Sequence, residues 1–152
     1  MMSRLNLCLL LVLGAVAGLR AEPASIVTGW DHVCVAPMKT SIYIGSVTLT
    51  TGVFERAGSS LTTTYQARVF PWVFWSESGR ITIGLTDAGL AAMAKGEKAE
   101  FSGVAANQKI KPRKVTGYAV PADASSGSIK VRILADGYTL VFNGSYLFGT
   151  GK

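Results

Sequence analysis

Histidine and cysteine are scarce in this sequence, which limits the chemistry that its side chains can perform. The chain of 152 residues has one histidine, His32, and two cysteines, Cys8 and Cys34. Zinc sites in proteins need three or four protein ligands, mostly Cys and His. His32 and Cys34 would point to the same side of an extended segment, but no further His or Cys completes a site around them. We therefore expect no metal and no cofactor.

Carboxylates are also few, and no hydrolase motif stands out. The nine acidic residues are scattered, so a pair for glycoside hydrolysis would have to converge from distant segments. No Gly-x-Ser-x-Gly sequence is present. We expect a non-enzymatic protein. An enzyme with an unrecognised acidic or serine site is the alternative.

The first 21 residues have the features of a secretory signal peptide. Arg4 precedes an apolar run at 5–16, and small residues lead to cleavage after Ala21 or near Gly18. The run is shorter than the roughly 20 residues of an ordinary membrane-spanning helix, although an uncleaved anchor is the alternative. We therefore expect export to the periplasm, the cell envelope or the exterior. Cleavage leaves Cys34 unpaired, which excludes an internal disulfide and leaves open a dimer linked through Cys34.

The remaining residues, 22–152, suffice for a single domain with its own core. We expect an irregular N-terminal segment at 22–39 and a β domain at 40–152. Segments rich in Val, Ile, Thr and Tyr alternate with Gly, Ser and Pro turns, as in antiparallel sheets. The pattern predicts an antiparallel β-sandwich or small β-barrel of six to eight strands, with one short helix at about 87–95.

That helix has clear boundary signals. Thr86 or Asp87 can accept hydrogen bonds from the first free N–H groups, and Gly96 suits the position after the helix end. At two to three turns it is too short to form a layer of its own. We expect it to cover an open end or edge of the sheet.

The C-terminal residues 128–148 predict a hairpin. Ile129, Val131 and Ile133 alternate with polar residues, and Asp136-Gly137 suits a tight turn with positive φ. Asn143-Gly144 leaves two interpretations open: a second turn, or one long strand with a glycine bulge. The aromatic residues before and after Gly144 are separated by even numbers of residues, so they would share one face of a continuous strand. This favours the long strand.

Positive charge is concentrated in one part of the chain. Residues 22–152 contain 13 basic and nine acidic residues, and residues 95–132 alone carry a net charge of +5. The segment 109–114 has four cations in six residues, and the hairpin adds two more on its polar face. The candidate anion-binding residues are Lys109, Lys111, Arg113, Lys114, Lys130 and Arg132. The alternative is a solvated basic loop.

Four aromatic residues at 70–75 form a second candidate. Such clusters line ligand pockets or mark interfaces, but in a small β domain they are more often part of the core. We therefore place Phe70, Trp72, Phe74 and Trp75 in the core.

Taken together, the sequence favours an exported β domain that binds something anionic. The partner would be an anionic lipid headgroup, a cell-wall polymer or an acidic protein surface. Nucleic acid is disfavoured, because no ladder of aromatic residues interleaves with the cations. A small outer-membrane β-barrel, which has a similar pattern of alternating strands, is the alternative.

Overall fold

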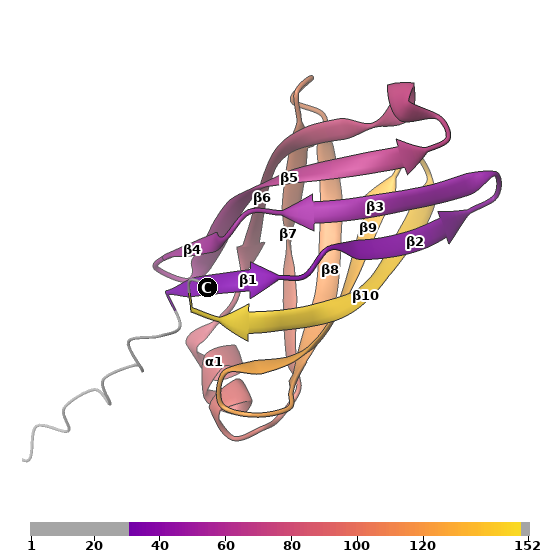
Figure 1. Cartoon of the computed structure of the whole chain (residues 1–152). Coiled ribbons are helices and arrows are strands. Elements are labelled where there is room, and N and C mark those ends of the chain that lie inside the picture. Colours follow the sequence, from indigo (N-terminus) through magenta and orange to yellow (C-terminus); the bar gives the residue numbers. More distant parts are fainter. Residues whose placement is uncertain (1–30, 150–152) are drawn as a thin grey trace, which may run out of the picture.

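The computed structural model describes residues 31–149, so the expected signal peptide lies outside the described part. These residues form a closed antiparallel β-barrel of eight strands with one short helix (Figure 1), as the sequence predicts. The strand segments are β1 (His32–Val35), β2 (Met38–Ile42), β3 (Gly45–Thr51), β4 (Phe54–Ala57), β5 (Ser60–Phe70), β6 (Glu77–Gly84), β7 (Ala99–Asn107), β8 (Pro112–Pro121), β9 (Ser126–Ala135) and β10 (Tyr138–Phe148).

Ten segments give eight barrel strands because two of the strands are interrupted. β1 and β2 follow one another around Pro37, and β3 and β4 follow one another around Gly52. Each barrel strand pairs with the next one along the chain, and β5 pairs on its other side with β6. Pairing of β1 with β10 closes the ring, whereas β2 beside it is laddered on one side only, with β3.

The closing strand corrects one of our expectations. We placed residues 22–39 in an irregular segment, yet β1 and the start of β2 are strands within the barrel. Pro37 does interrupt the ladder, because it falls in the break between β1 and β2. Four residues of β1 suffice to close the barrel, since each side of the strand pairs with a neighbour.

Alternating apolar residues from all the strands fill the barrel interior. Phe142, Leu49 and Val115 are the largest fully buried side chains. Val131 and Ile133 of the hairpin point inward as expected. The core thus comes from residues two apart on each strand, as the pleat requires.

The helix α1 (Asp87–Ala94) begins and ends as the sequence predicts. Thr86 accepts a hydrogen bond from the Gly89 amide at 3.1 Å, and Gly96 follows the helix with φ of 79°. Leu90 and Met93 are buried. In Figure 1 the helix lies across one end of the barrel, so the expected covering role is confirmed.

The C-terminal hairpin resolves the ambiguity at Gly144 in favour of one strand. Asp136 and Gly137 form the turn with φ of 48° and 86°. β10 then runs without interruption, and its pairing with β9 stays one-to-one through Gly144, so there is no bulge there. The glycine has a packing role instead: a Cβ at this position would lie 2.5 Å from Met38 Cγ. Met38 of β2 fills the space over this residue.

The expected core position of the aromatic cluster is wrong. β5 ends at Phe70, directly before Pro71, and the chain then forms the short 3₁₀ helix η1 (Val73–Trp75) outside the barrel. Phe70 is 68 % exposed and Trp75 is 55 % exposed. The barrel interior is already filled by the alternating strand residues, so these rings stay outside.

Candidate functional site

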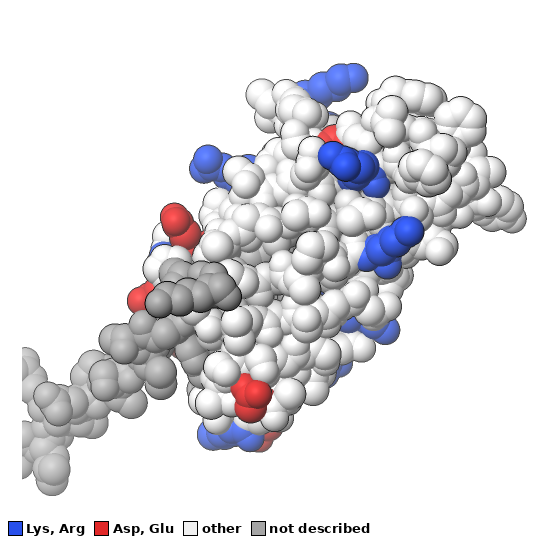
Figure 2. Space-filling model, viewed as in Figure 1, with Lys and Arg blue, Asp and Glu red and all other residues white. Residues whose placement is uncertain are grey.

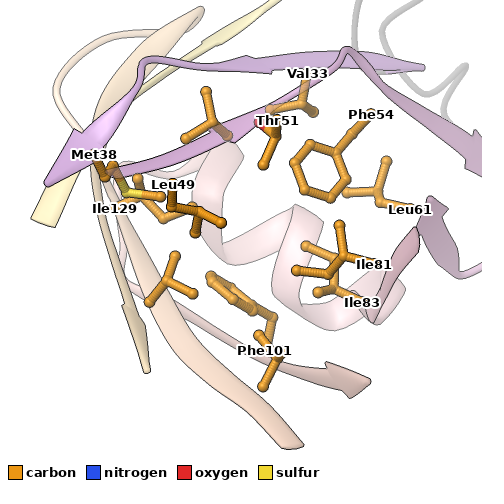
Figure 3. Close-up of a pocket in the computed structure, with 13 residues that line it drawn as sticks. Val33, Met38, Leu49, Thr51, Phe54, Leu61, Ile81, Ile83, Phe101 and Ile129 are labelled. Atoms are coloured by element: carbon orange, nitrogen blue, oxygen red, sulfur yellow. The ribbon is translucent and has the colours of Figure 1, made fainter. Parts of the chain in front are cut away.

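The barrel interior is too tightly filled to hold an organic ligand. Two cavities in the described part of the barrel have volumes of about 40 and 30 Å³, whereas sites for drug-sized molecules measure roughly 300–1,000 Å³. Figure 3 shows that Leu49, Phe54 and Ile81 point into the larger cavity, with Thr51 as the only polar residue among the 13 that line it. The outer surface is therefore the place for a functional site.

A polar network occupies the interior at the end opposite α1. Arg113 donates two hydrogen bonds of 2.9 Å to the carboxylate of Glu77, and Tyr65 and Asn107 donate to the same carboxylate. Arg113 also contacts Asp136 in the β9–β10 turn at 3.3 Å. The network links β5, β6, β7 and β8 to that turn and fixes their relative positions.

The network holds its charged groups in their ionised forms. Burial raises the pKa of Glu77, but hydrogen bonds from Arg113, Asn107 and Tyr65 outweigh it and leave this pKa below its ordinary value. The hydrogen bond to Glu77 raises the pKa of Arg113. Burial, together with the nearby Glu77 charge, raises the pKa of Tyr65, so the phenol stays a donor. These groups brace the barrel and are fully occupied with one another.

The candidate basic residues therefore divide into three groups. Arg113 is buried in the network, so it is not available to an external anion. Lys130 lies outside but is half-buried, 5.8 Å from the ring centre of Tyr118. The other four are exposed and lie close to the turns at the end opposite α1: Lys109, Lys111, Lys114 and Arg132.

Three further cations join these four. In an up-and-down barrel alternate turns lie at the same end, so the turns β2–β3, β5–β6, β7–β8 and β9–β10 share the end away from α1. Every exposed cation within four residues of one of these turns belongs to what we call the basic collar: Lys39, Arg68, Arg80, Lys109, Lys111, Lys114 and Arg132.

The charges of the barrel are strongly polarised between its two ends. Within four residues of the four turns there are eight basic and two acidic residues, a net charge of +6. The rest of the described chain has four basic and six acidic residues, a net charge of −2. In Figure 2 most red atoms accordingly lie toward the lower left, on the side of α1 and of β1, where the described chain begins.

The same four turns carry most of the exposed apolar surface. Nine of the 14 large exposed apolar residues in the described chain lie in or next to them, including all six exposed aromatic residues. We call this set the apolar end: Tyr43, Ile44, Phe70, Trp72, Val73, Phe74, Trp75, Ile110 and Tyr138. The knob at the upper right of Figure 2 is white, and η1 and the β2–β3 turn lie there.

The aromatic rings of Trp72 and η1 pack on one another. The ring centres of Trp72, Phe74 and Trp75 lie 5.3–5.8 Å apart, and two of the three pairs are edge-to-face. Gly45 lies against the backbone of Phe70, where an added Cβ would be 2.0 Å from the Phe70 carbonyl oxygen. This contact holds the β2–β3 turn beside the aromatic loop.

The β7–β8 turn presents an isoleucine between two lysines. Asn107 Oδ1 accepts hydrogen bonds from the amides of Lys109 and Lys111, both at 3.0 Å. Ile110 lies at the tip, is 82 % exposed and has φ of 57°. A β-branched residue seldom adopts this left-handed conformation, since its Cβ crowds the backbone.

Sequence reasoning found part of the collar but missed the apolar end. The segment 109–114 and Arg132 were visible as cations, and the aromatic residues at 70–75 were visible as a cluster. Their exposure could have been inferred from Pro71, which ends a strand immediately before three aromatic residues that lack a strand period. The contribution of Ile44 and Tyr138 depends on which turns share an end of the barrel, and only the topology reveals that.

The remaining sequence candidates do not converge on a site. His32 and Cys34 lie on β1, and the half-buried Cys34 thiol donates a hydrogen bond to the Gly149 carbonyl at 3.3 Å. Within residues 31–149, no group of three or more His, Cys, Asp and Glu residues has the geometry of a metal site. In the same range no helix has the length and apolar character to cross a membrane. Comparisons with protein-family models, curated proteins and solved structures found no match to this chain.

Proposed function

We propose that this protein is an exported, non-enzymatic β-barrel domain that binds an anionic surface through its basic collar. The observation that carries the proposal is the net charge of +6 around the four turns, against −2 elsewhere in the described chain. Such a polarised distribution orients a molecule toward an anionic partner and raises its association rate.

The exposure of the collar supports this role. All seven residues are exposed, and only Lys111 has an acidic partner in the described chain, Asp136. The other six have no acidic partner within residues 31–149, so they are open to an external anion. A lysine or arginine close to an anionic lipid surface contributes about 1 kcal/mol of binding free energy. Several such residues together give a binding strength that salt reduces.

The arrangement of side chains favours this proposal over an outer-membrane barrel. A membrane barrel presents an apolar band roughly 25 Å tall to lipid on its outside. Here most apolar residues of the strands fill the interior, and cations such as Lys39, Arg68 and Arg132 stand among the few apolar residues on the outer faces. We therefore expect the protein to remain in solution during purification without detergent.

Retention on a phosphate-bearing resin tests the proposal. We expect the triple variant Lys109→Ala, Lys114→Ala, Arg132→Ala to elute at clearly lower salt than the natural protein. The matched control removes three charges from the other part of the barrel: Lys95→Ala, Lys98→Ala and Lys130→Ala. Equal loss of retention in both variants would show that net charge alone acts, and would contradict a role for the collar.

A further inference from the structure

We propose that the apolar end enters the interface of an anionic phospholipid bilayer, with the basic collar at the level of the headgroups. This inference rests on the proposed function and narrows its partner to lipid. The bilayer is preferred to a protein groove or a polymer for four reasons, which concern shape, layering, backbone strain and orientation.

The apolar end is convex and already ordered. Its residues lie at turns and on η1, which project from the barrel, so a flat surface can reach them without a complementary groove. Tryptophan and tyrosine are the residues that favour the boundary between lipid and water. Because Trp72, Phe74 and Trp75 pack on one another, their rings lose little freedom on insertion.

The apolar residues and the cations are layered as a bilayer surface requires. Arg68 precedes Phe70 by two residues, and Lys114 follows the tip residue Ile110 by four. At about 3.3 Å per residue, Arg68 and Lys114 lie roughly 7–13 Å behind these apolar residues. Lys109 and Lys111 flank Ile110 directly, and their long side chains can reach back to the headgroups. Interfacial segments bury their apolar part about 5–10 Å deep, so the collar would meet the phosphate layer.

The conformation of Ile110 provides an independent indication. The turn held by Asn107 keeps this isoleucine at a positive φ and almost fully exposed, between Lys109 and Lys111. Glycine or asparagine would suit the backbone better, and neither would expose an apolar side chain. Strained residues of this kind cluster at functional positions.

The orientation is also consistent with lipid at this end. His32 and Gly149, near the two ends of the described chain, are hydrogen bonded to each other at the opposite end. The acidic residues Asp87, Glu97 and Asp123 lie in turns or in the α1 connection at that end. An anionic bilayer therefore attracts one end and repels the other.

Vesicle binding tests the inference, with tryptophan fluorescence as the readout. The chain has three tryptophans, so Trp30→Phe leaves Trp72 and Trp75 as the only reporters. With vesicles of phosphatidylglycerol and phosphatidylcholine we expect cosedimentation, a blue-shifted emission, and quenching by brominated lipid. Vesicles of phosphatidylcholine alone should bind much more weakly.

Three variants separate the inference from the proposed function. The tip variant Ile44→Ser, Val73→Ser, Phe74→Ser should lose about 100-fold in partitioning to the anionic vesicles, because three apolar side chains no longer leave water. It should still bind the phosphate resin. Its matched control, Val53→Ser, Val120→Ser, Leu147→Ser, removes exposed apolar residues elsewhere and should bind like the natural protein. Equal thermal stability of the tip variant and its control would establish that both are folded.

The outcomes are distinct. If the tip variant binds vesicles like the natural protein, the inference is wrong and the proposed function stands. If the collar variant of the previous section keeps its retention on the resin, the proposed function fails as well. A concentration-dependent dimer in the absence of lipid, lost in the tip variant and accompanied by no vesicle binding, would instead assign the apolar end to a second copy of the chain.

Discussion

The left-handed conformation of Ile110 leads to a prediction about stability that can be worked out from the structure. We expect Ile110→Gly to make the protein slightly more stable, although it removes a side chain. The left-handed conformation costs an L-residue about 1–2 kcal/mol, and glycine does not have this cost. Glycine loses about 0.4–1 kcal/mol through the greater freedom of the unfolded chain. With Ile110 at 82 % exposure, the lost burial costs only about 0.4 kcal/mol.

Mid-range values therefore leave Ile110→Gly about 0.5 kcal/mol more stable than the natural protein. Ile44→Gly is the matched control, because Ile44 lies in another turn at the same end, is 57 % exposed and has no positive φ. It loses both burial and chain entropy, together about 1.5 kcal/mol.

The measurement is the thermal midpoint of the two variants. The expected difference of about 2 kcal/mol corresponds to about 8 °C in Tm for a domain of this size. Equal destabilisation by the two substitutions would refute the strain at Ile110. Higher stability of Ile110→Gly together with weaker vesicle binding would indicate that the isoleucine is kept for function.

Two further predictions concern the interior. Glu77→Gln removes the carboxylate that accepts two hydrogen bonds from the buried Arg113 and leaves only Asp136 as its anion. It should cost about 3 kcal/mol at pH 7, whereas Glu100→Gln, in the exposed pair with Lys98, should cost less than about 0.5 kcal/mol. Because the pKa of Glu77 is below its ordinary value of 4.5, its contribution is present above that pH and is lost as the pH falls through the lower folded value. Denaturation between pH 7 and pH 2 should therefore be less pH-dependent in Glu77→Gln, and an unchanged slope would contradict the ionised pair. Gly144→Ala should cost about 1–3 kcal/mol by crowding Met38, and Met38→Ala in the same chain should relieve part of that loss. Strictly additive effects in chemical denaturation would exclude the contact.

The fold could be predicted from the sequence because local signals agree with one another. Thr86 and Gly96 bound the helix, and Asp136-Gly137 fixes the register of the last hairpin. These local signals do not distinguish a β-sandwich from a β-barrel. The choice between them depends on the pairing of β1 with β10, more than 100 residues apart in the chain, and the short β1 offers little periodicity by which to recognise it.

The candidate site was predictable only in part, for a similar reason. Charge can be counted along the chain, so Lys109, Lys111 and Lys114 stood out. Burial depends on where a segment leaves the sheet. For this reason Arg113, which we expected to be exposed, is buried, and Trp75, which we expected in the core, is exposed. Arg113 continues the inward alternation of β8 and meets Glu77, while Trp75 follows the end of β5 and lies outside. A cation on the inward face of a strand can thus be buried, and an aromatic residue after a strand-ending proline can be exposed. Side-chain polarity alone therefore does not predict burial.

The polar network and the apolar end are physically connected, which gives the network a purpose beyond stability. Buried ion pairs contribute little net free energy compared with apolar packing, so their presence calls for another reason. Glu77 opens β6 directly after the aromatic loop, Arg113 follows the β7–β8 turn, and Asp136 forms the β9–β10 turn. The network therefore ties together the bases of three of the four turns that carry the apolar end. An apolar core at this position would fill the barrel equally well, but directional bonds hold the turns in fixed relative positions, as a surface that meets a flat partner requires. On this argument the tips should stay ordered without a ligand, and loss of Glu77 should weaken vesicle binding even at temperatures where the variant remains folded.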